Sequence, residues 1–108
     1  MRLRNAAIAA TSALALVFAV PTSANAATGD FLYKVGPGVP AGIADPQSRE
    51  CINLFGATEE HPAFAPENFT TSTATVFLDF DCDGDVFYVM NPGRKLGDRL
   101  KLRSVVFS

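Results

Sequence analysis

The amino-terminal 26 residues have the three-part pattern of a secretory signal peptide, which limits the folded protein to a short chain. Arg2 and Arg4 supply positive charge, residues 6–20 form an apolar run, and an Ala-Asn-Ala tripeptide ends at Ala26. The apolar run is shorter than the roughly 20 residues of a membrane-spanning helix, and Pro21 follows it directly. We therefore predict cleavage after Ala26, export to the cell exterior, and no membrane attachment of the product.

The chain that remains, residues 27–108, is long enough for one domain with a small core. A domain of this size buries only about 60 to 65% of its extended surface, so a covalent crosslink adds useful stability. Cys51 and Cys82 are the only cysteines, and export favours their oxidation. Closing a loop of about 32 residues contributes about 3.7 kcal/mol in the chain-entropy model. We predict a Cys51–Cys82 disulfide rather than reactive thiols.

The secondary-structure pattern is that of β-strands, because five short runs of β-forming residues alternate with clusters of Gly, Pro, Asp and Asn. Apolar and polar residues alternate in the third and fifth runs with the period of two typical of half-buried strands. No amphipathic helix is evident. The predicted strands are 31–35, 51–54, 75–80, 86–90 and 100–107. The sequence therefore predicts an all-β domain.

Two connections between these runs are informative. Asp83-Gly84 is a hairpin signal, because glycine takes a positive φ without a Cβ clash, so residues 75–90 are expected to form an antiparallel hairpin. Residues 55–68 contain prolines and glycine among polar side chains and are predicted to be a long exposed loop. Because loops commonly carry function, we expect function to be displayed there or at the hairpin tips.

Several short segments in the second part of the chain also occur together in a known family. These segments are 51–54, 68–70, 76–84, 88–93 and 104–107. In this order they resemble the βγ-crystallin-like secreted proteins of actinobacteria, and among them peptidase inhibitor family I36. The resemblance implies a small Greek-key sandwich. It leaves open whether the N-terminal half forms a complete first Greek key or a degenerate one.

The resemblance implies fold-defining roles for three residues. Phe77 is expected to pack on a folded-over hairpin, and Gly84 to lie at its sharp bend. Ser104, on the same face as Leu102 and Val106, is expected to point inward and bond the bent backbone, because a buried hydroxyl needs a partner. A plainer interpretation makes Ser104 a polar residue of an edge strand, and both interpretations remain open here.

Two segments rich in acidic or amide side chains raise the question of calcium. Residues 79–85 match the opening of an EF-hand loop, but Met90 occupies the position of the closing glutamate and no helices flank the segment. A solvated sheet face would explain the alternating aspartates equally well. Those aspartates are Asp79, Asp81, Asp83 and Asp85. Glu67 and Asn68 imitate part of a crystallin calcium motif, in a register that makes them a linker. We predict no cofactor and no dedicated metal site, and leave weak cation binding open.

Other chemistry is sparse. His61 is the only histidine, so a zinc site of the usual nitrogen or sulfur ligands cannot be assembled once the cysteines are oxidised. No nucleophile-elbow sequence supports a catalytic triad. Loss of Arg2 and Arg4 from nine basic residues leaves seven against eleven acidic residues, a net charge of −4. That charge does not favour nucleic-acid binding. We expect a non-catalytic monomer.

The favoured function is a secreted inhibitor of extracellular peptidases of the metallopeptidase type. The candidate inhibitory loop is 55–66, where Glu59, Glu60 and His61 could reach a metal or a basic subsite and Pro62 stiffens the backbone. This assignment rests on loop length and chemistry, not on the resemblance. An extracellular structural or binding module with weak calcium binding, and a secreted antimicrobial protein, are the alternatives.

Overall fold

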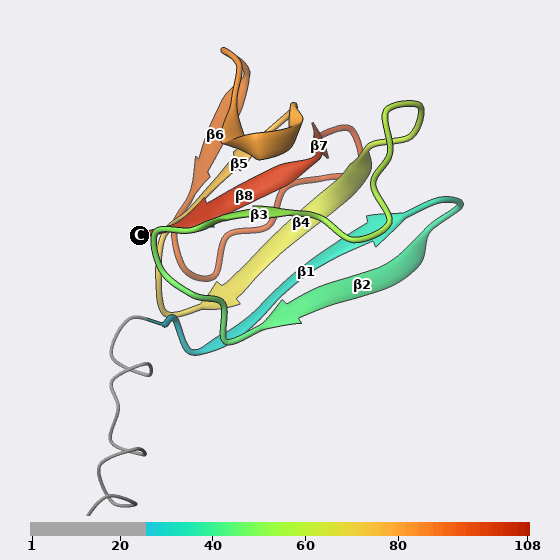
Figure 1. The fold of residues 1–108 in the computed structure, drawn as a ribbon. Helices are drawn as coiled ribbons and strands as arrows, with labels where there is room; N and C mark the ends of the chain where they lie inside the picture. The colour runs from blue at the N-terminus through green and yellow to red at the C-terminus, as the bar shows by residue number, and fades with distance from the viewer. Residues whose placement is uncertain (1–25) are drawn as a thin grey trace, which may run out of the picture.

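The computed structural model describes residues 26–108, which form two antiparallel four-stranded sheets with no α-helix in that range (Figure 1). The strands are β1 (Gly29–Val35), β2 (Val39–Ala44), β3 (Cys51–Asn53), β4 (Ala63–Thr70), β5 (Ala74–Phe77), β6 (Phe87–Met90), β7 (Lys101–Leu102) and β8 (Ser104–Phe107). A short 3-10 turn, η2 (Phe80–Cys82), lies between β5 and β6. The all-β prediction is confirmed. The predicted signal peptide lies, apart from Ala26, outside the described residues.

The strand order interlocks the two halves of the chain. The first sheet has the order β2-β1-β4-β7 and the second has the order β3-β8-β5-β6. Each sheet therefore takes three strands from one half of the chain and one strand from the other half. Because β3 and β7 are exchanged in this way, neither half completes its sheet alone.

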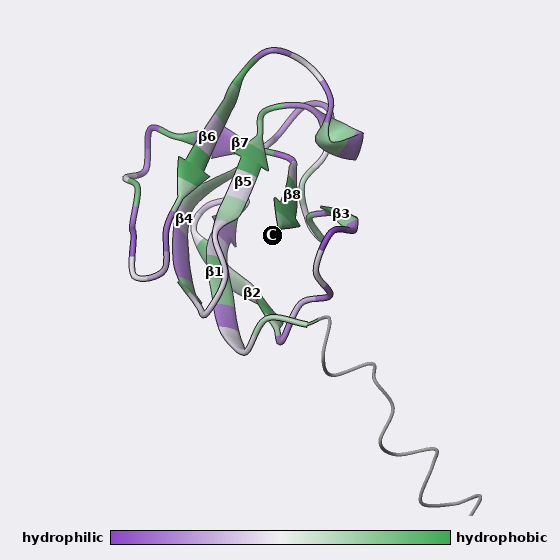
Figure 2. Ribbon diagram, turned by 90° about the vertical axis from the view of Figure 1, so that its left-hand side faces the viewer, coloured by the Kyte–Doolittle hydropathy of each residue, from purple (hydrophilic) through white to green (hydrophobic). Residues whose placement is uncertain are grey.

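The core lies between the sheets. Phe31 and Tyr33 of β1 and Val105 and Phe107 of β8 are all buried in one apolar cluster. The Phe31 and Phe107 rings meet edge to face, with centroids 5.5 Å apart. Figure 2 shows the apolar character of β5, β6 and β8 in the second sheet. Burying each such side chain contributes about 1.5–3 kcal/mol, so this contact between the sheets holds the sandwich together.

Two strands occur where none was predicted. β2 has only partly buried or exposed side chains and contains Pro40 and Gly42, so its sequence lacks a strand signal. β4 occupies the second half of the segment predicted to be an exposed loop, and that prediction is wrong for residues 63–68. The pairing of β1 with β4 is irregular between Leu32 and Lys34, which places a bulge near Pro66. A bulge tolerates proline inside a sheet, which is why β4 can form there.

The C-terminal run also differs from its prediction. Residues 100–107 form two strands rather than one, because the chain passes from the first sheet to the second at Arg103. The antiparallel pairing of β5 with β6 is confirmed, with Ala74 opposite Met90 and Phe77 opposite Phe87. The two strands are not joined by a tight turn at Asp83-Gly84. Their connection, residues 78–86, is longer and contains η2.

Candidate functional site

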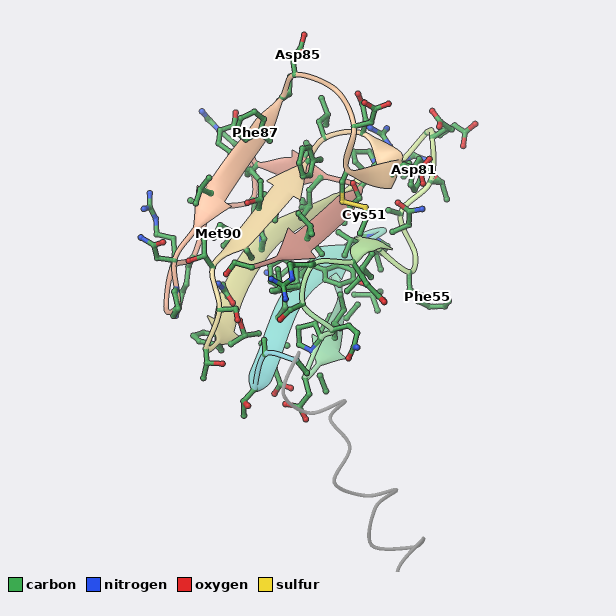
Figure 3. The ribbon with its side chains drawn as sticks, turned by 60° about the vertical axis from the view of Figure 1, so that its left-hand side comes forward. Cys51, Phe55, Asp81, Asp85, Phe87 and Met90 are labelled. Atoms are coloured by element: carbon green, nitrogen blue, oxygen red, sulfur yellow. A yellow bond between two sulfur atoms is a disulfide. The ribbon has the colours of Figure 1, made fainter. Side chains whose placement is uncertain are left out.

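The disulfide joins the two halves of the chain on the second sheet. Cys51 at the start of β3 is bonded to Cys82 in η2, so the predicted pairing is confirmed (Figure 3). Two residues further along β3, Asn53 makes a reciprocal pair of hydrogen bonds with Asp81. Its Nδ2 donates to Asp81 Oδ1 over 2.9 Å, and the Asp81 N–H donates to Asn53 Oδ1 over 2.7 Å. The disulfide and Asn53 together hold η2 against β3.

Ser104 fastens the same connection from β8. Its side chain is fully buried, and its hydroxyl donates to the Asp79 carbonyl over 2.6 Å while accepting from the Cys82 N–H over 2.9 Å. Phe77 lies opposite Ser104 in the sheet, and its ring is 5.7 Å from that of Phe87. The chain between β5 and β6 is therefore bonded back onto β3 and β8.

Gly84 lies beyond η2 in the same connection, with a φ of +87°. A Cβ at this position would collide with the carboxylate of Asp79. The left-handed backbone conformation therefore favours glycine, whereas the exposed side chain of Asp79 can move away from a Cβ. The three fold-defining residues of the sequence analysis thus lie on or beside one folded connection.

The acidic residues of this connection are spread out. Asp81 is bonded to Asn53, and Asp83 Oδ1 accepts from the N–H of Gly84. Asp85 projects from the far end of the connection (Figure 3). Among residues 26–108, no group of three or more His, Cys, Asp or Glu side chains is placed to hold a metal ion.

Asn68, considered above as a partial calcium motif, is instead a buried structural residue of β4. Its Nδ2 donates to the carbonyls of Ser72 and Met90, both over 2.9 Å. Its Oδ1 accepts from the N–H of Thr70 over 3.0 Å and from the Thr70 hydroxyl over 2.7 Å. Both amide protons and both lone pairs are therefore used. This role cannot be recognised from sequence, because a buried asparagine and an exposed one look alike there.

The connection between β3 and β4, residues 54–62, displays an aromatic side chain in its first part. We call this connection the β3–β4 loop. Leu54 is buried, and its N–H donates to the carbonyl of Arg103 over 2.9 Å. Phe55 is 87% exposed, while its carbonyl accepts a hydrogen bond from the Tyr33 hydroxyl over 3.1 Å. Burial raises the pKa of Tyr33 above its ordinary value, which keeps this donor protonated. The backbone at Phe55 is thus fixed while its ring is in solvent.

The second part of the β3–β4 loop carries the charged residues of the sequence prediction. Glu59, Glu60 and His61 are all exposed, and Pro62 is partly buried just before β4. The N–H of Thr58 donates to the His61 carbonyl, and the N–H of His61 donates to the Thr58 hydroxyl, both over 2.9 Å. This pair of bonds closes a turn whose two carboxylates and imidazole are exposed to solvent.

The side chain of Arg103 is hydrogen-bonded to the backbone of this turn. Its Nε donates to the Thr58 carbonyl over 2.9 Å, and a terminal nitrogen donates to the Glu59 carbonyl over 2.6 Å. The other terminal nitrogen donates to the Leu78 carbonyl over 3.1 Å, so the guanidinium joins the β3–β4 loop to the β5–β6 connection. No pattern in the sequence indicates this role for Arg103. Arg103 lies where the chain passes from one sheet to the other, and this change of sheet is visible only in the folded structure.

A scan against models of known families, a search of curated proteins and a search of solved structures each find no significant match to this chain. In the part of the chain that the structure describes, no helix is long and apolar enough to cross a membrane. The interpretation of the β3–β4 loop therefore depends on its own geometry.

Proposed function

We propose that this chain is a secreted, non-catalytic inhibitor of extracellular peptidases of the metallopeptidase type, which binds its target through the β3–β4 loop. One observation carries the proposal. The side chains of Phe55 and of residues 58–61 are exposed, while the loop backbone is held by hydrogen bonds from Tyr33 and Arg103. A loop fixed in this way loses little conformational entropy when it binds, which favours tight association.

The exposed groups of the loop suit such a target. The exposed ring of Phe55 is a suitable anchor for an apolar specificity pocket. Carboxylates and imidazole are ligands of catalytic zinc, and Glu59, Glu60 and His61 present both. The loop thus combines an apolar anchor with groups that can approach a metal centre.

We further propose that the fold is a βγ-crystallin-like sandwich of two Greek keys. Two observations support this. The order β2-β1-β4 in the first sheet has a counterpart, β6-β5-β8, in the second, and each half gives its third strand to the other sheet. Ser104 also bonds a folded hairpin, as the resemblance implies. On this proposal the N-terminal half forms a complete key. The disulfide is compatible with an extracellular protein of the kind the resemblance implies.

The test is a titration of the oxidised protein into a panel of secreted metallo- and serine peptidases, following hydrolysis of a small peptide substrate. We expect stoichiometric loss of metallopeptidase activity. Joint replacement of Glu59, Glu60 and His61 by alanine should weaken inhibition by about tenfold or more, and Phe55→Ala should do the same, because anchors dominate such interfaces.

Matched controls lie outside the loop. Asp98→Ala with Arg99→Ala removes two exposed charges between β6 and β7 and should leave inhibition unchanged. Absence of inhibition across the panel would overturn the proposed function. Inhibition that survives all the loop substitutions would leave an inhibitor whose contact surface is elsewhere.

A further inference from the structure

Strand β6 is an apolar edge. Val86, Phe87, Tyr88 and Val89 are between 46% and 54% exposed, although all four are large apolar or aromatic residues. β6 is the last strand of the order β3-β8-β5-β6 and pairs only with β5. No charged residue occurs between Asp85 and Arg94. Edge strands of monomeric proteins usually carry a charge, a proline or a bulge that prevents further pairing, and the β6 residues have none of these.

The backbone of β6 is oriented to accept another strand. The N–H of Leu78 donates to the Val86 carbonyl over 3.0 Å, which defines one hydrogen-bonded pair at the start of the hairpin. In an antiparallel ladder such pairs alternate, so Tyr88 and Met90 also direct their main-chain groups toward β5. The N–H and C=O groups of Phe87 and Val89 therefore point to the open side, where no strand of the described chain lies.

We propose that two copies of this chain associate through β6, antiparallel, about a two-fold axis at Tyr88. In this register Phe87 lies opposite Val89 of the second copy, and Val89 lies opposite its Phe87. Each of these pairs exchanges two main-chain hydrogen bonds, because both residues have outward-facing groups. The contact is isologous, as in most dimers, and it joins the two second sheets into one continuous sheet.

The charges at the two ends of β6 favour a second copy over another partner. Asp83 and Asp85 precede the strand. Arg94 follows it, and the Arg94 carbonyl accepts from the N–H of Asn68, whose side chain also donates to Met90 at the end of β6. Antiparallel pairing brings the acidic end of one copy beside the basic end of the other, and the two-fold axis repeats this arrangement at both ends. The strand is therefore complementary to itself in charge as well as in hydrogen bonding and apolar surface.

The inference goes beyond peptidase inhibition and departs from the monomer expected from sequence. β3 lies at the opposite edge of the second sheet from β6. Phe55 of the β3–β4 loop is also far from Phe87 and Met90 in Figure 3. The dimer would thus present two free β3–β4 loops at its two ends.

The first test is sedimentation velocity of the oxidised protein from low micromolar to millimolar concentration. We expect a dimer whose population rises with concentration. Val89→Lys puts a charge into the contact and should weaken dimerisation by about tenfold or more. Val39→Lys is the matched control, because Val39 is 52% exposed on β2, the edge strand of the other sheet. It should leave the dimer unchanged, and circular dichroism should show that both variants fold.

Two further variants test the register. Tyr88→Cys should give a disulfide-linked dimer, because facing residues of a non-hydrogen-bonded antiparallel pair have Cα atoms about 4.5 Å apart. Val89→Cys should crosslink poorly, because Val89 does not face itself. Asp85→Lys should weaken the dimer, and adding Arg94→Glu should restore it. A monomer at every concentration overturns the proposal. A dimer that is indifferent to Val89→Lys and Tyr88→Cys shows that the contact is elsewhere and also overturns it.

Discussion

The hairpins β1–β2 and β5–β6 occupy corresponding places in the two sheets, but their connections are built differently. In the first hairpin, a short turn through Gly36 and Gly38 joins the strands, and the Gly38 N–H donates to the carbonyl of Val35 over 3.1 Å. The second connection passes through η2 and is fastened to β3 and β8. The comparison shows that a folded connection is not needed to form the hairpin. Its fastening adds stability that the turn of the first hairpin does not supply, so that hairpin depends on its ladder and on the core packing of Phe31 and Tyr33.

This difference has a consequence for local stability. The β5–β6 connection depends on a disulfide and on single side chains from other strands, whereas the β1–β2 turn has no such attachment beyond its own backbone bond. We therefore expect substitutions at these attachments to loosen the second hairpin before the first. Native-state hydrogen exchange reports this directly, because it measures local opening residue by residue.

The largest effect is expected from removal of the disulfide by Cys51→Ser with Cys82→Ser. The free energy of unfolding should fall by about 3–4 kcal/mol, because the denatured chain regains the entropy of a long loop. Denaturant unfolding of the double variant beside the oxidised wild type measures this loss. Exchange should accelerate more in β5–β6 than in β1–β2. Equal acceleration in both hairpins would contradict the comparison.

Asn68→Ala should cost about 3 kcal/mol, because it leaves several buried backbone and hydroxyl groups without their partner. Asn68 belongs to β4 but donates to Met90 at the end of β6, so this residue links the two halves. We expect both hairpins to be destabilised together, unlike in the cysteine variant. Asn91→Ala, at an exposed asparagine, is the control and should change unfolding by less than about 0.5 kcal/mol.

Ser104→Ala should cost about 1–2 kcal/mol, because the Asp79 carbonyl and the Cys82 N–H each lose a hydrogen bond. The loss should be local, with faster exchange near η2 and little change in β1–β2. Ser108→Ala removes an exposed hydroxyl and should be close to neutral. A neutral Ser104→Ala would show that the disulfide, Asn53 and Arg103 hold the connection without Ser104.

Tyr33→Phe in the first hairpin should cost about 1 kcal/mol, because the carbonyl of Phe55 loses its donor. Burial raises the pKa of Tyr33, so above about pH 10 the unfolded chain releases this proton more readily than the folded chain. Stability contributed by the neutral hydroxyl is therefore present below that pH and lost as the pH rises through the folded pKa. Thermal unfolding at increasing pH should show this decline in the wild type. If the stability of Tyr33→Phe declines with pH as much as that of the wild type, Tyr33 is not the source of the decline.

Part of the fold could be predicted from local pattern. The strand signals at 31–35, 51–54 and 86–90 correspond to β1, β3 and β6, and the export pattern with two cysteines predicted the disulfide. β2 and β4 could not be predicted in this way. Pro66 in β4 is accommodated only because a bulge lies beside it, and the bulge exists only in the paired sheet.

The candidate site also has residues that local sequence could predict and residues that it could not. The chemistry of Glu59, Glu60 and His61 and their place in a loop could be predicted from sequence. Arg103 could not, because its three carbonyl partners come from segments about 25 and 45 residues away along the chain. Phe55 lies within the predicted loop. Only the folded structure shows that its ring is exposed while its carbonyl is bonded to Tyr33.

The all-β class, the disulfide and the loop that carries the charged residues thus follow from the local sequence. These depend on composition and on a period of two, which are local properties of the chain. Tertiary structure alone decided the exchange of β3 and β7 between sheets, the burial of Asn68 and the carbonyl cluster around Arg103. Each of these is a contact between distant segments, and its energy comes from burial and hydrogen bonding that do not exist until the sheets have packed.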